Sequence, residues 1–305
     1  MQPDWSLLYQ SFLEGDTRSL ARLLSFVENG MPGYRELLAG LEWPDDVRVV
    51  GITGPPGAGK STLTDGLIGE LVNAGKKVAV LCVDPSSPFN LGAVLGDRIR
   101  MSQWYTHPSV FIRSLATRGS MGGLHPRILE LTDLLRAARF DYIIVETVGV
   151  GQSEIEIAGL ADTTVVVLVP EAGDEVQTMK AGLMEIADIF VVNKADRPDA
   201  ASFLKNLRQM LAPAFSQQTH EIAVLSTVAQ DGTGIPELAA AIEADRTQPH
   251  NRARKDWLLA EKAWQLIQQE RMGDLSKEGL REAIRQSGER NLYRLVERFT
   301  SPGAR

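Results

Sequence analysis

The sequence predicts an α/β protein whose core is a doubly wound, mostly parallel β-sheet. Short apolar runs alternate with segments of helical spacing along most of the chain, and continuous apolar runs are typical of strands buried on both faces of a parallel sheet. The first of these runs leads into the glycine-rich stretch 54–61, and a helical pattern follows from Thr62 to Ala74. A strand, a glycine-rich loop and a helix in this order form the first unit of many doubly wound sheets.

The remaining elements follow in chain order. Apolar positions at helical spacing over residues 5–41, interrupted at Gly15, Gly30 and Pro32-Gly33, predict a short helical extension. Strands are expected near residues 47–53, 78–83, 142–147, 163–169, 188–193 and 222–226. Segment 84–140, between the second and third of these strands, is too long for a simple crossover and rich in turn residues, so we expect conformationally responsive loops there.

Beyond Arg246–Pro249 the pattern becomes entirely helical. Trp257, Ala260, Trp264 and Ile267 fall on one helical stripe. A lone helix cannot hide such a stripe from water, so we expect it to form a homodimer interface; packing back on the α/β domain is the alternative. The sequence therefore predicts three parts, an N-terminal helical extension at 1–44, an α/β domain at 45–248 and a C-terminal helical dimerisation arm at 249–305.

Composition excludes several classes of protein. The chain has 305 residues and a formal net charge of -7, which leaves no excess of Lys and Arg to coat nucleic acid. Its one cysteine, Cys82, lies in an apolar run and suits a buried position in a reducing compartment. No run approaches the roughly 18 apolar residues of a membrane span, and the N-terminus lacks a secretory pattern. We expect a cytoplasmic protein that binds neither nucleic acid nor membrane.

The glycine-rich stretch predicts a phosphate-binding loop. Its glycines let backbone N–H groups surround phosphate oxygens, and the following helix presents its positive dipole end to them. Lys60 is expected to reach the β- and γ-phosphates, and Ser61 to ligate Mg²⁺. The expected nucleotide-binding residues here are Gly54, Pro55, Pro56, Gly57, Ala58, Gly59, Lys60, Ser61 and Thr62.

A second motif predicts which base is bound. Asn193-Lys194-Ala195-Asp196 directly follows an apolar run, which places it at the edge of the sheet where ligands bind. The Asp196 carboxylate can accept hydrogen bonds from the N1 and N2 donors of guanine, whereas adenine has no matching donors. The expected nucleotide is therefore GTP or GDP. Ser226 and Thr227, after the next strand, are weaker candidates for a further base contact.

Acidic residues at neighbouring strand ends indicate hydrolysis. Glu146 ends the third expected strand, where GTPases place an acid that orients the Mg²⁺ shell, and the N–H of Gly149 can reach the γ-phosphate. Asp84 and Asp97 are further acids for the metal or its waters, although Asp97 also suits a solvated loop acid paired with Arg98 or Arg100. The expected metal set is Ser61, Asp84, Asp97 and Glu146.

Unassisted hydrolysis should be slow. Val150 occupies the position where many small GTPases carry the glutamine that orients the attacking water. Valine cannot orient a water, so Gln152 or an acid from elsewhere would have to substitute. Slow hydrolysis suits a switch protein whose nucleotide state is recognised by a partner protein.

Taken together, these motifs resemble the MeaB/ArgK family of GTPase chaperones for adenosylcobalamin-dependent acyl-CoA mutases. The resemblance covers residues 45–245, in which the phosphate loop is followed by Val83–Pro88, Gly96–Met101, Arg118-Gly119 with Gly122-Gly123, Glu146–Glu154 and Asn193–Asp196. It implies a P-loop GTPase domain at 45–248 and GTP, GDP and Mg²⁺ as ligands, with adenosylcobalamin reached only through the partner mutase. It also implies that this chain gates cobalamin loading and protects or reactivates the mutase.

The same resemblance implies roles for particular residues. Asp84, Asp97 and Glu146 would be magnesium and catalytic-site acids, together with the phosphate-loop lysine Lys60. Residues 171–180 would form a third switch that reports the nucleotide state to the mutase, with Lys180 as its contact. The family often has Gly where this chain has Glu171 and a second basic residue at Ala181, so methylmalonyl-CoA mutase is the default partner and a relative acting on another acyl-CoA is the alternative.

Two other classes compete with this interpretation. A P-loop kinase would not need the Asn-Lys-x-Asp motif, and no site for an acceptor substrate is evident. A nickel-insertion GTPase would require a cluster of Cys or His, whereas His107, His125, His220 and His250 are scattered.

Overall fold

The computed structural model describes most of the chain as two compact units, one ending at Lys255 and the other starting at Asp256. The described residues are 5–84, 101–117, 124–149, 153–172, 186–215, 222–245, 251–271 and 276–300. Each unit is described by itself below.

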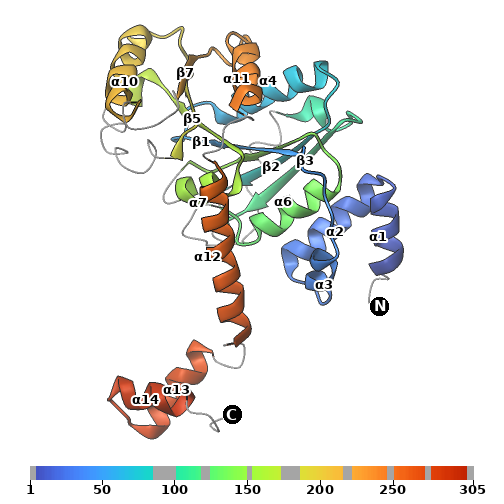
Figure 1. Ribbon diagram of the computed structural model, residues 1–305, viewed down its shortest axis with the longest axis vertical. Coiled ribbons are helices and arrows are strands. Elements are labelled where there is room, and N and C mark those ends of the chain that lie inside the picture. The colour runs from blue at the N-terminus through green and yellow to red at the C-terminus, as the bar shows by residue number, and fades with distance from the viewer. Residues whose placement is uncertain are drawn as a thin grey trace. The chain divides into compact units, whose positions relative to one another are not determined.

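The first unit is built on a seven-stranded sheet with the order β3-β2-β4-β1-β5-β6-β7, in which every pair of neighbours is parallel (Figure 1). The strands are β1 (Arg48–Thr53), β2 (Val78–Asp84), β3 (Val110–Ala116), β4 (Tyr142–Glu146), β5 (Thr163–Leu168), β6 (Ile189–Val192) and β7 (Ala223–Ser226). The chain winds outward from β1 in both directions, which confirms the predicted doubly wound fold. The crevice beside β1 is the expected ligand position in such a sheet.

The strand β3 was not predicted. We expected conformationally responsive loops within residues 84–140 and named no strand there; the described part of that segment includes β3 and α6 (Ile128–Ala137). Among the described strands β3 pairs with β2 alone, so it lies at the edge of the sheet and is only partly buried. Arg113 interrupts its apolar pattern; its guanidinium forms an ion pair with Glu28 and donates a hydrogen bond to Ser25 Oγ at 3.1 Å.

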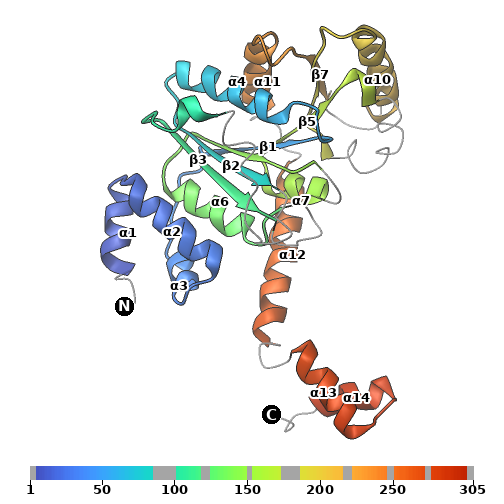
Figure 2. The ribbon, with the colours of Figure 1, turned by 180° about the vertical axis from the view of Figure 1, so that it is seen from behind.

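Helices cover both faces of the sheet (Figures 1 and 2). On one face, α4 (Lys60–Asn73) and α11 (Ile235–Asp245) pack on alternate residues of β1, β2, β4 and β5. On the other face lie α6 and α7 (Ser153–Leu160), and α10 (Ala200–Phe215) packs on this face against β5 and β6. The buried residues of β5 alternate between the two cores, with Val165 and Val167 in the first and Val166 and Leu168 in the second. Because successive residues face opposite cores and both cores are apolar, the sequences of these strands are unbroken apolar runs.

The predicted N-terminal extension consists of α1 (Trp5–Leu13), α2 (Thr17–Asn29) and α3 (Tyr34–Ala39). Asp16 caps α2 by accepting a hydrogen bond from the N–H of Ser19 at 2.8 Å, and Gly30 ends it in the left-handed conformation. α2 packs on α6 and supplies the partners of Arg113. The described part of this unit also includes two short 3-10 helices, η1 (Ser102–Trp104) and η2 (Pro170–Ala172).

The second unit contains the end of α12 (Asn251–Arg271), α13 (Lys277–Ser287) and α14 (Leu292–Thr300). Ser276 caps α13 through a 2.9 Å hydrogen bond from the N–H of Gly279. Trp257, Trp264 and Ile267 of α12 are exposed, and so is Leu292 of α14. Among the described residues, no helix combines the length and apolarity of a membrane span.

Candidate active site

The phosphate loop lies between β1 and α4, as the sequence predicts, and two of its glycines are required by close contacts. Gly54 has φ +138°, and a Cβ there would lie 2.1 Å from the carbonyl oxygen of Val167. Gly59 has φ +88°, and a Cβ there would lie 2.4 Å from Nδ2 of Asn193. Gly59 also starts α4 without a side chain to cap it, so the first N–H groups of the helix remain available to an anion. Pro55 and Ala58 are buried, whereas Pro56 and Gly57 are exposed at the tip.

The ammonium group of Lys60 lies inside this loop. Only 7% of the residue is exposed, and Nζ donates hydrogen bonds to the carbonyl oxygens of Gly54 at 2.9 Å, Pro55 at 3.2 Å and Val148 at 3.4 Å. A Cβ at Gly149 would lie 2.5 Å from this Nζ. The structure therefore brings Lys60 and Gly149, two of the predicted site residues, to the same point.

An acid and two hydroxyls form a buried group next to this loop. Ser61 Oγ donates to Glu146 Oε1 at 2.6 Å, and Thr64 Oγ1 donates to Glu146 Oε2 at 2.8 Å. Asp84 ends β2, the neighbour of β4, and is 5% exposed. Hydroxyl and carboxylate oxygens are the ligands that Mg²⁺ prefers. The described members of the predicted metal set, Ser61, Asp84 and Glu146, therefore fit magnesium, and Ser61 with Glu146 would hold it.

Several sequence predictions fall on residues that the structure does not describe. These are Asp97, Val150, Gln152 and residues 173–180 of the expected switch, with Lys180 among them. Their roles stay predictions.

The Asn-Lys-x-Asp motif follows β6 and lines a cavity of about 170 Å³. The lining comes from the phosphate-loop region, from the motif and from the loop after β7. Its residues are Gly59, Thr62, Asn193, Lys194, Asp196, Arg197, Val228, Ala229 and Gln230. The same cavity thus joins the two motifs that the sequence assigns to phosphate and base. Lys194 adopts φ +57° and donates from Nζ to the carbonyl oxygen of Gly57 at 2.7 Å.

Asn193 connects three loops at this position. Its Nδ2 donates to the carbonyl oxygen of Ala58 at 2.8 Å, while Oδ1 accepts from Thr227 Oγ1 at 3.0 Å and from the N–H of Ala229 at 3.1 Å. The residue is 2% exposed. Asn193 therefore fixes the phosphate loop against the loops that follow β6 and β7.

The structure separates the two weaker base candidates from the cavity lining. Thr227 is buried and holds Asn193, and Ser226 is exposed. Val228, Ala229 and Gln230 line the cavity instead. The sequence reasoning also missed Thr64 and Arg197. The spacing of three residues between Ser61 and Thr64 on one helix face was the signal that could have found Thr64.

Arg197 links the cavity to the segment that follows β5. Its guanidinium forms an ion pair with the carboxylate of Glu171 in η2. The hydrogen bond from Arg197 lowers the pKa of Glu171. Glu171 thus contacts the loop that carries Asp196.

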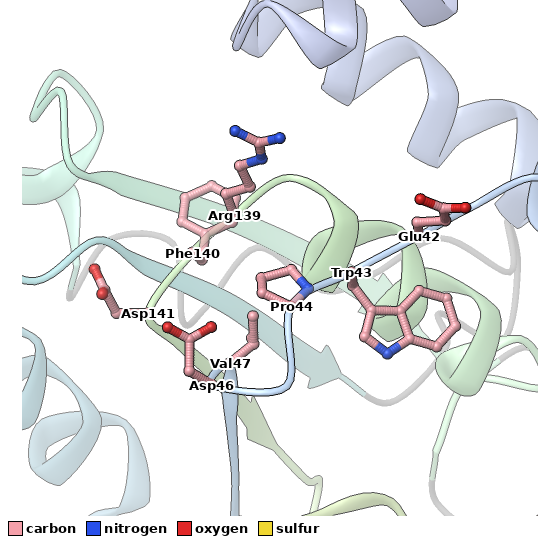
Figure 3. A pocket seen from close by; sticks show the side chains of 8 residues that line it. All are labelled: Glu42, Trp43, Pro44, Asp46, Val47, Arg139, Phe140 and Asp141. Carbon is pink, nitrogen blue, oxygen red and sulfur yellow. The ribbon is translucent and has the colours of Figure 1, made fainter.

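A larger cavity, of about 520 Å³, lies away from these motifs. Figure 3 shows its lining side chains, which come from the segment that enters β1 and from the turn between α6 and β4. This is the amino-terminal end of the strands, and the lining includes no residue of the phosphate loop or of the Asn-Lys-x-Asp motif. We therefore assign the nucleotide to the smaller cavity despite its size.

Comparison with known proteins identifies the family of this chain. The sequence model of a family described as "Methylmalonyl Co-A mutase-associated GTPase MeaB" matches residues 20–282. A protein of Pyrococcus abyssi that is named as a GTPase is 50% identical over 247 residues, which cover 78% of this chain and 75% of that protein. The GTPase ArgK of Escherichia coli is 41% identical over 188 residues, or 60% of this chain and 57% of that protein.

Two further relatives bear on the comparison. A Caenorhabditis elegans protein named "Methylmalonic aciduria type A homolog, mitochondrial" is 38% identical over 210 residues, which cover 64% of this chain and 53% of that protein. A crystal structure of "LAO/AO transport system kinase" has a TM-score of 0.72 and 26% identity, and covers 99% of this chain and 100% of the other. Since the family match extends over most of the chain and the phosphate and base motifs meet in one cavity, this protein is a GTPase of the MeaB family.

Proposed function

We propose that this GTPase is a chaperone of an adenosylcobalamin-dependent acyl-CoA mutase. The family match is the observation that carries this proposal, because the family is described by its association with methylmalonyl-CoA mutase. In the proposed role the nucleotide state gates the loading of adenosylcobalamin and protects or reactivates the mutase. Methylmalonyl-CoA mutase is the default partner, and a mutase for another acyl-CoA is the alternative.

The proposed hydrolytic roles follow from the contacts around the phosphate loop. Lys60 would exchange its carbonyl partners for the β- and γ-phosphates, and the N–H of Gly149 would bind the γ-phosphate. The proposed magnesium ligands are Ser61 and Glu146, together with Asp84 and Asp97. Bound Mg²⁺ would neutralise charge on the phosphates. Asn193, Lys194 and Asp196 would bind guanine, with Thr227 acting through Asn193.

A partner is proposed to accelerate a slow intrinsic reaction. Val150 cannot orient the attacking water, so Gln152 or a group ordered by the mutase would do so. Residues 171–180 would form the switch that the mutase reads, and Lys180 would contact the developing charge of the transferred phosphoryl group. The Glu171–Arg197 ion pair supports this proposal, because it ties the beginning of the run to the base-binding loop.

We also propose that the chain is a cytoplasmic homodimer that pairs through residues 249–305. The exposed Trp257, Trp264 and Ile267 of α12 support this proposal, since large exposed apolar groups commonly mark an interface. The buried Cys82 suits a reducing compartment. The three-part division at 44/45 and 248/249 is kept as a prediction.

The decisive experiment combines capture and kinetics. Tagged protein is used to pull a mutase from the native cell, and GTP hydrolysis is measured with and without that mutase. We expect recovery of an acyl-CoA mutase and a faster rate in its presence. The Lys180→Ala variant should lose the acceleration while its affinity for nucleotide stays nearly unchanged. No acceleration by the captured mutase would refute the partner role, and full acceleration of Lys180→Ala would exclude Lys180.

A kinase is the second candidate, because the matching crystal structure is described as a transport system kinase. The fate of labelled γ-phosphate separates the two functions. Release as inorganic phosphate supports a GTPase chaperone, whereas transfer to an acceptor molecule supports a kinase. Nickel binding by the purified protein would favour the third class, a nickel-insertion GTPase.

A further inference from the structure

Thr64 lies in the second turn of α4, three residues after Ser61 and on the same helix face. It is fully buried, and Ser61 and Glu146 are 5% and 3% exposed. The two hydroxyls face the two oxygens of one carboxylate, with Ser61 Oγ 2.6 Å from Oε1 and Thr64 Oγ1 2.8 Å from Oε2 of Glu146. The carboxylate is therefore held at both oxygens by α4.

The hydroxyl proton of Thr64 has two acceptors within reach. One is Glu146 Oε2, and the other is the carbonyl oxygen of Lys60 at 2.9 Å. That carbonyl is already the normal acceptor for the backbone N–H four residues later in the helix. A hydrogen bond to a carboxylate is roughly twice as strong as one between neutral groups. The Thr64 hydroxyl therefore donates its proton to Glu146 Oε2 in preference to the Lys60 carbonyl oxygen.

The length of the Glu146 side chain makes this contact possible. Glu146 ends β4, where its register partners are Ile52 of β1 and Cys82 of β2. From this position the carboxylate reaches both the first and the second turn of α4. An aspartate would be shorter by one methylene, which would prevent the same carboxylate from reaching both hydroxyls without a shift of the backbone.

We propose that Thr64 is a positioning residue for GTP hydrolysis. Its hydroxyl fixes Oε2 of Glu146, and this directs Oε1 toward Ser61 and the magnesium that both residues are suited to hold. Without the hydroxyl, the buried carboxylate can rotate away from Ser61, so the site binds magnesium less tightly. The inference rests on the proposed magnesium site of Ser61 and Glu146 and not on the proposed mutase partner.

The test compares Thr64→Val, which keeps the shape and removes the hydroxyl, with Thr64→Ser, which keeps the hydroxyl. The affinity of the full-length protein for the non-hydrolysable analogue GMPPNP is measured by calorimetry in Mg²⁺ and in EDTA. Thr64→Val should need about tenfold more Mg²⁺ for half-maximal analogue binding, the effect expected for one lost hydrogen bond to a charged group. Its affinity in EDTA should be unchanged, and Thr64→Ser should behave like the wild type.

A Glu146→Gln background shows whether Thr64 acts through Glu146. If it does, adding Thr64→Val to Glu146→Gln should have little further effect, because residues in one hydrogen-bond network are not additive. Thermal unfolding identifies a variant that does not fold, and Thr64→Ala then replaces Thr64→Val. Wild-type Mg²⁺ dependence in Thr64→Val, equal impairment of Thr64→Ser, or an undiminished effect in the Glu146→Gln background would each overturn the proposal.

Discussion

The nucleotide-binding edge of the sheet and the C-terminal helices differ in whether their side chains find partners within the chain. At the edge, buried polar groups such as Lys60, Ser61 and Asn193 each form hydrogen bonds within the chain. On α12, by contrast, Trp257 and Trp264 are 55% and 59% exposed. The buried polar groups of the phosphate and base motifs therefore find partners within the chain, whereas the large apolar side chains of α12 remain in contact with water. The predictions below test the two halves of this contrast.

The largest effect is expected from Asp196→Asn. This change replaces a carboxylate that accepts from guanine with a group that also donates, so GTP affinity should fall on the order of 10²-fold or more. Xanthine nucleotides should bind better than they do to the wild type. Calorimetry with GTP, XTP and ATP measures the change. Asp199→Asn is the matched control, because Asp199 follows in the same loop, does not line the cavity and has φ +68°, which Asn tolerates. Wild-type protein that binds ATP as well as GTP would contradict the assignment of the base.

A pair of glycine variants tests how tightly the edge is packed. Gly57 and Gly59 have φ +78° and +88°, so alanine is strained at both by about 1 kcal/mol. A Cβ at Gly57 meets nothing within 4 Å, whereas one at Gly59 lies 2.4 Å from Asn193 Nδ2. Gly59→Ala should therefore lower the free energy of unfolding by about 2 kcal/mol more than Gly57→Ala. Urea unfolding of nucleotide-free protein measures both values, and equal losses would show that Asn193 moves aside freely.

The next prediction concerns the exposed stripe of α12. Trp257→Ser combined with Trp264→Ser should shift the protein from dimer to monomer at micromolar concentration and leave GTP affinity unchanged. Light scattering and calorimetry check the two parts. Gln268→Ala on the same helix is the control, since Gln268 is exposed and polar. A wild-type monomer would favour the alternative, in which the stripe packs on its own chain.

The smallest effect is expected at Asp133 of α6. Burial raises the pKa of this carboxyl to about 6, although Arg136, at 3.9 Å, opposes the rise. The folded state therefore binds the proton more tightly than the unfolded state. This contribution to stability is complete below the ordinary pKa of 3.8 and is lost as the pH rises through about 6.

Asp133→Asn should accordingly gain stability relative to the wild type as the pH rises from 4 to 7. The gain should be about 1–2 kcal/mol, because 24% of the side chain is exposed and solvent weakens the effect. Unfolding curves at both pH values measure it. Asp45→Asn, at an exposed position, should show no such trend. A constant difference between Asp133→Asn and wild type across this range would mean that folding does not raise the pKa of Asp133.

The strands that are buried on both faces could be predicted from the sequence, because such strands are continuous apolar runs. Six of the seven strands were predicted within two residues of their observed ends. The exception, β3, lies at the edge of the sheet, where Arg113 faces α2 and interrupts the run. Only the packing of the N-terminal helices on that edge explains why a strand tolerates an arginine there.

The same division holds for the site. The phosphate loop and the Asn-Lys-x-Asp motif are short, contiguous stretches whose spacing carries the chemistry, so sequence alone located Lys60, Ser61 and Asp196. The tertiary structure was needed to find the partners of three other residues, because each partner lies far away in the sequence. Thr64 contacts Glu146, Thr227 contacts Asn193, and Arg197 contacts Glu171. Parallel strands bring their carboxyl ends to one edge of the sheet. No local sequence pattern predicts which side chains then form hydrogen bonds or ion pairs with one another at that edge.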